Sequence, residues 1–180
     1  MIIYTDVVSG DEMLSDTFDI KPSPDCPILW EVDCRKYMKK VGEDIQLEGA
    51  NPSAEDAEDD GGEGETVMVH DIEDQFRMVW LKVEEGLKPS KEHYKAHLKT
   101  YVKKVMKALE AKKADAAVVD EFKKNAAAAI KKISANYDNY DVLMGQSMDG
   151  DAMHVLIDFR EDGVTPYATL WKHGLNEMKV

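Results

Sequence analysis

The sequence has few cysteines and no long apolar run. Only Cys26 and Cys34 occur among 180 residues, so we expect no disulfide framework and a reducing, cytoplasmic location. No apolar stretch approaches the roughly 20 residues that span a bilayer, so membrane insertion is not expected. The first residues, Met1–Tyr4, lack the basic and apolar regions of a signal peptide. The chain length fits one domain with its own core.

The usual catalytic and metal-binding motifs are also missing. The sequence contains no GxGxxG, GxxxxGK[ST] or GxSxG. Seven residues separate Cys26 from Cys34, which matches neither a redox CxxC pair nor a zinc knuckle. His93 and His97 have the spacing of a zinc pair, but Tyr94 stands where a metalloprotease motif has Glu. We therefore expect no enzymatic activity, no zinc and no obligatory cofactor.

Basic residues are scarce overall but concentrated in one segment. The formal net charge of −13 argues against general binding to nucleic acids or anionic membranes. Residues 88–132 nevertheless hold thirteen lysines against five acids, while the rest of the chain holds ten basic and thirty-one acidic residues. This asymmetry favours an acidic partner surface for the basic segment. The alternative is a solvated face without a partner.

Residues 48–65 form an acidic segment with eight carboxylates and no Lys or Arg. We expect a mobile loop here, because the segment has almost no apolar residue to bury. An EF-hand starting at Asp56 fails, since its twelfth position is Val67 instead of Glu. Clustered carboxylates could still bind Ca²⁺ at roughly millimolar strength; the alternative is a loop that only keeps the protein soluble. The calcium candidates are Glu55, Asp56, Glu58, Asp59 and Asp60.

The basic segment predicts a helical hairpin over residues 89–137. Ser90 is a typical N-cap, and apolar residues recur at helical spacing from Tyr94 to Leu109. After a break, Asp115 can cap a second helix whose apolar stripe runs from Val118 to Tyr137. The short connection predicts antiparallel helices. Lysines that advance by four residues form a strip on the first helix: Lys91, Lys95, Lys99, Lys103 and Lys107.

Short β-branched or aromatic segments flank this hairpin and predict strands. They cover residues 28–32, 66–69, 78–81, 153–159 and 167–172. Strands on both sides of a helical insertion predict a single α+β domain over residues 1–180, with a sheet that the C-terminal segment completes. The expected β-core comprises residues 1–47, 66–88 and 140–180.

Several motifs in order resemble the translationally controlled tumour protein family. Met1–Tyr4 and Asp11–Asp16 resemble the opening of its members, and Gly49–Glu55 resembles their first signature. Tyr140–Phe159 and the following Arg160–Tyr167 are similar to the second signature and its C-terminal strand pair. The resemblance covers essentially the whole chain. It implies an Mss4-like β-tent with an inserted antiparallel helical hairpin and a mobile acidic loop. The paired CxxC motifs that bind zinc in Mss4 are absent here.

The resemblance also implies a function. Family members are cytoplasmic, multi-partner regulators, and some are nuclear or secreted without a signal peptide. They are linked to calcium binding, microtubule association, small GTPases, translation elongation factors, cell growth and anti-apoptotic activity. Glu12 matches the family glutamate proposed to contact a Rheb-type GTPase, and Lys91–Lys132 matches the tubulin-binding segment. We further expect the acidic segment to compete with tubulin for the lysines.

Three departures from the family pattern qualify these expectations. The Gly-Glu of the second signature is Gly145-Gln146 here, which weakens a GTPase surface that relies on that carboxylate. The chain ends in Val180 where many members end in Cys, so a monomer is expected. Three prolines within Asp16–Pro27 disfavour a BH3-like helix. The alternative function is an enzyme of the methionine sulfoxide reductase type, with one of the two cysteines as nucleophile.

Overall fold

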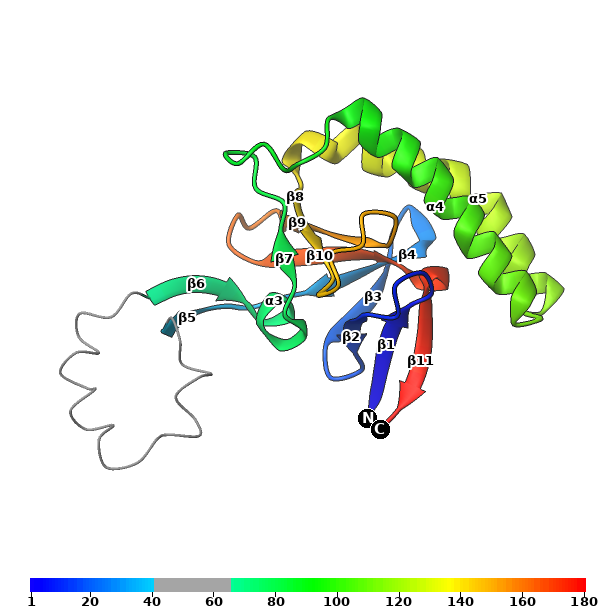
Figure 1. The fold of residues 1–180 in the computed structure, drawn as a ribbon, viewed down its shortest axis with the longest axis horizontal. Helices are drawn as coiled ribbons and strands as arrows, with labels where there is room; N and C mark the ends of the chain where they lie inside the picture. Colours follow the sequence, from blue (N-terminus) through cyan, green and yellow to red (C-terminus); the bar gives the residue numbers. More distant parts are fainter. Residues whose placement is uncertain (41–65) are drawn as a thin grey trace.

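The computed structural model describes residues 1–40 and 66–180, which form an α+β fold as predicted (Figure 1). Its largest described sheet has six antiparallel strands in the order β3-β4-β10-β9-β8-β7. Three of these strands precede the helical hairpin in sequence and three follow it, so the C-terminal segment does complete the sheet. The strands are β3 Asp19–Ser23, β4 Cys26–Asp33, β7 Val79–Trp80, β8 Asp141–Met144, β9 His154–Phe159 and β10 Pro166–Trp171.

Two smaller sheets complete the described β-structure. A three-stranded sheet places β1 (Ile2–Asp6) between β2 (Glu12–Ser15) and β11 (Leu175–Lys179), which brings the two ends of the chain together. The remaining pair, β5 (Lys36–Lys40) and β6 (Thr66–His70), projects from the body as a ribbon (Figure 1).

Two helices of 21 residues each form the predicted hairpin. They are α4 (Lys91–Ala111) and α5 (Ala116–Asn136), and they lie side by side and antiparallel (Figure 1). The Ser90 Oγ accepts a hydrogen bond from the His93 amide at 3.3 Å, which confirms the predicted N-cap. Asp115 does occupy the N-cap position of α5, but its side chain makes no capping hydrogen bond. α5 packs against β4, and 3₁₀ turns follow at Tyr137–Asn139 and Lys172–Gly174.

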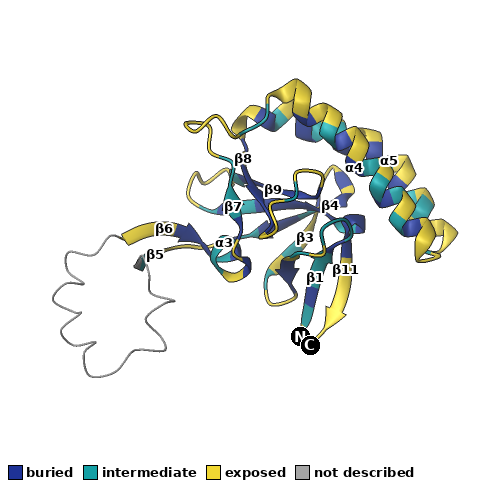
Figure 2. Cartoon of the chain, in the orientation of Figure 1, coloured by how far each residue is buried: buried dark blue, intermediate teal, exposed yellow. Residues whose placement is uncertain are grey.

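The predicted apolar stripes form the hairpin side of the core (Figure 2). In α4 the residues of the stripe at Tyr94, Leu98, Tyr101, Val105 and Leu109 are all buried. In α5 the buried residues are Phe122, Ala126, Ala129, Ile133 and Ser134. Val118 was wrongly assigned to the stripe. It is 37% exposed because it lies in the first turn of α5, at the end of the hairpin that extends past the sheets (Figure 1).

Other elements differ from the prediction or were not predicted. The strand expected at 78–81 is reduced to Val79–Trp80, because the short helix α3 (Asp71–Phe76) directly precedes it and ends at Arg77 in a left-handed conformation. Strands β1, β2, β3, β5, β8 and β11 were not predicted individually. Asp16–Pro27 contains strand β3 and no helix, as its prolines predicted. No described helix is both long and apolar enough to cross a membrane.

Candidate functional site

Glu12, the candidate GTPase contact, is exposed at the first position of β2. It pairs with Thr5 of β1, next to an irregularity in the strand register. The preceding turn reverses the chain between β1 and β2, and Gly10 within it has a φ of +78°, a conformation that favours glycine. The candidate carboxylate is thus presented at the end of a tight turn instead of along an open strand.

The second-signature loop, residues 145–152, docks on Asp11, the residue before Glu12. The Asp11 Oδ2 accepts hydrogen bonds from the Ser147 amide at 3.2 Å and from the Ser147 hydroxyl at 2.6 Å. Gly145 approaches so closely that a Cβ atom there would lie 2.4 Å from the same Asp11 oxygen. A larger residue at position 145 would therefore have to displace the Asp11 side chain. Glu12 and Gln146 are both exposed, and each is the chain neighbour of a residue in this contact.

A buried carboxylate beneath this surface holds its parts together. Asp6 is 1% exposed, and its side chain accepts hydrogen bonds from the Met153 amide at 2.9 Å and the Tyr101 hydroxyl at 3.2 Å. It also accepts bonds from the Val8 amide and the Ser9 hydroxyl, both at 3.1 Å. The carboxylate is thus fully hydrogen-bonded, as buried charges need to be. It joins the β1–β2 turn, helix α4 and the end of the 145–152 loop.

A continuous chain of hydrogen bonds leads from this carboxylate to the loop. Ser9, whose hydroxyl donates to Asp6, accepts a bond from the Asp11 amide at 3.2 Å. The Asp6 amide in turn donates to the Asp11 carbonyl at 2.9 Å. These bonds hold the backbone of Asp11 in place, and its carboxylate is left to accept the bonds from Ser147. We define the Glu12 surface as Glu12 with the loop 145–152.

The five predicted lysines of α4 form a second candidate site, the lysine strip. Lys91, Lys95, Lys99, Lys103 and Lys107 are all exposed, and none makes an ion pair with another described residue. Four other lysines of the basic segment contact the rest of the described structure: Lys88, Lys104, Lys112 and Lys132. Lys88 donates to the Tyr140 carbonyl at 2.6 Å, and Lys104 lies 3.5 Å from the Asp151 carboxylate. Among residues 1–40 and 66–180, the strip is therefore a row of unpaired positive charges on one helix.

The opposite side of α4 is lined by aromatic rings. His97 packs against His154 with ring centroids 4.6 Å apart, and Tyr94 contacts both rings. Burial lowers the pKa of His154 to about 3, with a smaller contribution from His97, and burial also lowers the pKa of His97. His93, in contrast, is exposed beside Ser90. The two histidines with zinc-pair spacing thus lie in different environments, and His97 is part of the packing.

Both cysteines are buried and poorly suited to catalysis. Cys26 and Cys34 are 1% and 3% exposed. Burial raises the pKa of the Cys34 thiol to about 12 and also raises the pKa of Cys26. A nucleophilic cysteine needs an accessible thiolate, which requires a lowered pKa. The structure therefore gives no support to the alternative of a methionine sulfoxide reductase.

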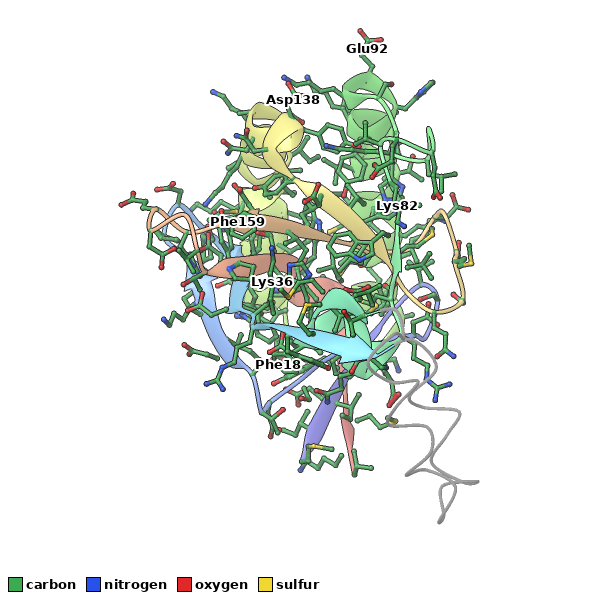
Figure 3. The ribbon with its side chains drawn as sticks, turned by 90° about the vertical axis from the view of Figure 1, so that its left-hand side faces the viewer. Phe18, Lys36, Lys82, Glu92, Asp138 and Phe159 are labelled. Carbon is green, nitrogen blue, oxygen red and sulfur yellow. The ribbon has the colours of Figure 1, made fainter. Side chains whose placement is uncertain are left out.

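The structure also contains a cleft that the sequence did not reveal. It has a volume of about 970 Å³ and lies between the start of β3, the β4–β5 junction, α3 and the β9–β10 turn. Phe18 and Lys36 belong to its walls, and Lys36 Nζ lies 4.5 Å above the Phe159 ring (Figure 3). Its charges are of both signs, and Asp33 is already paired with Arg160 at 2.7 Å. No arrangement of nucleophile and base is apparent among the described lining residues.

The calcium candidates Glu55, Asp56, Glu58, Asp59 and Asp60 lie outside the described residues. The acidic segment as a whole, residues 48–65, also lies outside the described residues, so its predicted mobility stays a prediction. Within residues 1–40 and 66–180, no group of three or more His, Cys, Asp or Glu side chains could hold a metal ion. The described part of the chain therefore offers the Glu12 surface and the lysine strip as its two candidate interaction sites.

Comparisons with known proteins match the whole chain. A family model described as "Translationally controlled tumour protein" matches residues 1–176. The chain is 72% identical to the translationally-controlled tumor protein homolog of Aspergillus fumigatus, over 100% of both chains. It is 43% identical to the Schizosaccharomyces pombe homolog, over 97% of each. The solved S. pombe structure, "Translationally Controlled Tumor-associated Protein p23fyp", superposes with a TM-score of 0.75 at 40% identity, over 100% of both chains. The Caenorhabditis elegans structure gives a TM-score of 0.63 at 28% identity, over 100% of this chain and 99% of that one.

Proposed function

Because the chain belongs to the translationally controlled tumour protein family, as its motifs predicted, we propose that it is a non-enzymatic regulatory protein with several protein partners. Its first proposed partner is a small GTPase of the Rheb type, bound through the Glu12 surface. The observation that carries this proposal is the clamp, the pair of hydrogen bonds from Ser147 to Asp11, which ties the second-signature loop to the residue before Glu12. Such a preorganised surface loses little conformational entropy on binding.

The GTPase proposal can be tested by a direct binding measurement. Calorimetry with a purified Rheb-type GTPase should show a complex with the unmodified chain. Glu12→Lys should weaken it at least tenfold, because a reversed charge at the centre of an interface costs several times the thermal energy. Asp16→Lys, at another exposed acid near β2, is the matched control and should change the affinity little. Equal losses in both variants would point to a general effect of net charge and would contradict the proposal.

The second proposed partner is tubulin, bound through the lysine strip. Five exposed lysines without ion pairs in the described structure favour an acidic partner surface. Co-sedimentation with microtubules tests this proposal.

The chain's own acidic segment would compete with tubulin for the lysine strip. This remains a prediction, because the acidic segment lies outside the described residues. Deletion of residues 55–65 should strengthen co-sedimentation at low salt, and weaker binding after the deletion would contradict the competition.

The remaining family roles are proposals of the same kind. They comprise contacts with translation elongation factors, a link to cell growth and anti-apoptotic activity, weak calcium binding without an obligatory cofactor, and a cytoplasmic location. Calcium binding should be weak, at roughly millimolar strength, because the sequence lacks the ligand spacing of an EF-hand. Calorimetry that detects a submicromolar calcium site would contradict this proposal.

A further inference from the structure

We propose that Met148 is an apolar anchor of the Glu12 surface and that Asp11 is the residue that positions it. This inference rests on the proposed GTPase contact and adds residues that recognise the partner. The partner surface would carry an apolar pocket for the Met148 side chain, and Lys or Arg residues would surround that pocket. Three features of the 145–152 loop support this proposal: the exposure of Met148, its backbone conformation, and the charges around it.

Met148 is held in an unusual conformation at the tip of the loop. Its side chain is 59% exposed, although methionine is usually a core residue. Its φ is +59°, a left-handed conformation that costs energy for a residue with a Cβ atom. The Met148 amide donates to the Gly145 carbonyl at 2.9 Å, which closes the turn. The loop therefore projects a large apolar side chain into solvent and maintains a strained residue to do so.

Both sides of Met148 are fixed by hydrogen bonds. On one side, Ser147 donates twice to Asp11. On the other side, Asp149 accepts bonds from the Asp151 amide at 2.9 Å and the Ala152 amide at 3.2 Å. Because the residues before and after it are restrained, the position of Met148 is set by the fold. A thioether on a flexible stem also adapts well to a partner's apolar pocket.

The charges near Met148 predict the partner's chemistry. Asp149 and Asp151 lie within the loop, Glu12 follows the residue that the loop binds, and Lys104 lies 3.5 Å from the Asp151 carboxylate. The surface thus combines one exposed apolar side chain with three carboxylates. Interfaces often have this arrangement, in which a buried anchor supplies affinity and rim charges select the partner. The complementary surface on the partner is an apolar pocket with a cationic rim.

Asp11 acts on this surface through the loop and needs no contact with the partner. Replacing it with Ala removes both hydrogen bonds to Ser147 and frees the loop. Asp11→Asn retains one side-chain oxygen, which can still accept from Ser147. The conservative variant should therefore preserve the position of Met148, whereas the alanine variant should not. This difference separates a positioning role from a role of the Asp11 charge itself.

The test uses the full chain and a Rheb-type GTPase loaded with GDP, with dissociation constants measured by calorimetry. Met148→Gln and Asp11→Ala should each weaken binding about tenfold, the size typical of an interface anchor. Asp11→Asn should stay within about threefold of the unmodified chain. Met68→Gln is the matched control, because Met68 is 54% exposed on the distant strand β6 and should leave binding unchanged. Amide hydrogen exchange of Ser147 reports the clamp without any partner, and it should accelerate in Asp11→Ala.

The possible outcomes separate this inference from the proposed function. If Glu12→Lys abolishes binding while Met148→Gln and Asp11→Ala do not weaken it, the GTPase contact stands and the inference is overturned. If the unmodified chain does not bind the GTPase, the proposed function and the assignment of Met148 to it both fall. In that case, Ser147 exchange still decides the clamp: unchanged exchange in Asp11→Ala overturns the positioning role, and faster exchange supports it.

Discussion

The Glu12 surface and the lysine strip are built in opposite ways. The Glu12 surface joins segments far apart in sequence: Asp11 and Ser147 are 136 positions apart, and Asp6 and Met153 are 147 positions apart. Both of these connections are hydrogen bonds to a carboxylate. The lysine strip lies on a single helix, one lysine per turn from Lys91 to Lys107, and none of the five has an ion-pair partner in the described structure.

This difference predicts two modes of recognition in one domain. A surface fixed by hydrogen bonds selects a partner by shape, and its affinity depends on the fold beneath it. A row of exposed lysines attracts acidic surfaces over a distance of about 10 Å at 0.1 M salt, and the attraction weakens as salt increases. Changes in the buried network should therefore affect stability and specificity, and changes in the strip should affect only salt-dependent binding.

The largest effect should come from Asp6→Ala, which removes the centre of the buried network. Tyr101 and Met153 would lose their hydrogen-bond acceptor inside the protein, and each buried unpaired donor costs about 1–3 kcal/mol. We expect the free energy of unfolding to fall by roughly 3–5 kcal/mol, and Tm by about 10 °C. Urea denaturation measures the first value and calorimetry the second.

Asp16→Ala is the control for this prediction, because Asp16 is exposed one residue beyond β2. It should change the unfolding free energy by less than about 0.5 kcal/mol. A similarly small loss in Asp6→Ala would show that the network adds little to stability. The contrast between a fold-dependent surface and an independent strip would then be wrong.

The next effect concerns pH and the inner face of α4, beneath the lysine strip. Burial lowers the pKa of His154 to about 3 in the folded protein, while the unfolded value is about 6.5. Below pH 6.5 the unfolded chain therefore binds a proton that the folded chain excludes, so stability falls with decreasing pH. At pH 4.5 this residue should cost about 2–3 kcal/mol relative to pH 7.

His154→Phe isolates this contribution, because phenylalanine keeps a ring against Tyr94 and His97 and cannot be protonated. Between pH 7 and 4.5, urea denaturation should show the variant losing about 2–3 kcal/mol less stability than the unmodified chain. If both proteins lose the same unfolding free energy between pH 7 and 4.5, protonation of His154 does not destabilise the folded state. Water would then reach the inner face of α4.

The same contrast explains what the sequence could predict. The lysine strip and the apolar stripes of the hairpin depend on periodicity within one helix, and the predicted positions from Tyr94 to Leu109 are those that the fold buries or half-buries. The exception, Val118, shows the limit of periodicity, which gives a face of a helix but not how far the neighbouring sheets extend along it.

The clamp could not be predicted in this way. Glu12 was identified through the family resemblance alone, and Asp6, Asp11 and Ser147 carry no local pattern that marks them as partners. Their bonds depend on the pairing of β1 with β2 and on the path of the loop after β8. The short strands β1 and β2 were missed individually for a related reason, since four or five residues give too little alternation to predict register.

The third effect should be confined to low salt. Lys99→Glu together with Lys103→Glu should reduce microtubule co-sedimentation about tenfold near 0.05 M salt, because two exposed charges on the strip are reversed. Near 0.5 M salt the difference should nearly vanish, as screening removes the attraction. The matched control, Lys82→Glu with Lys179→Glu, makes the same charge change at exposed sites away from α4. Equal losses in both double variants would show that only net charge matters.

The smallest effect should come from Gln146→Glu, which restores the carboxylate that the second signature has in other family members. Gln146 is exposed, and its neighbours Gly145 and Ser147 are both in contact with Asp11, so the new charge would lie in a part of the loop that is fixed to the β1–β2 turn. A single rim charge on an exposed surface contributes up to about 1 kcal/mol, so GTPase affinity should increase about two- to fivefold, mainly through faster association. Stopped-flow association and calorimetry measure the two quantities. Asn139→Asp adds the same charge at an exposed site next to the end of α5 and should leave both unchanged. If Gln146→Glu weakens binding or has no effect, the partner's surface is not cationic at this position, and the Glu12 surface recognises its partner by shape alone.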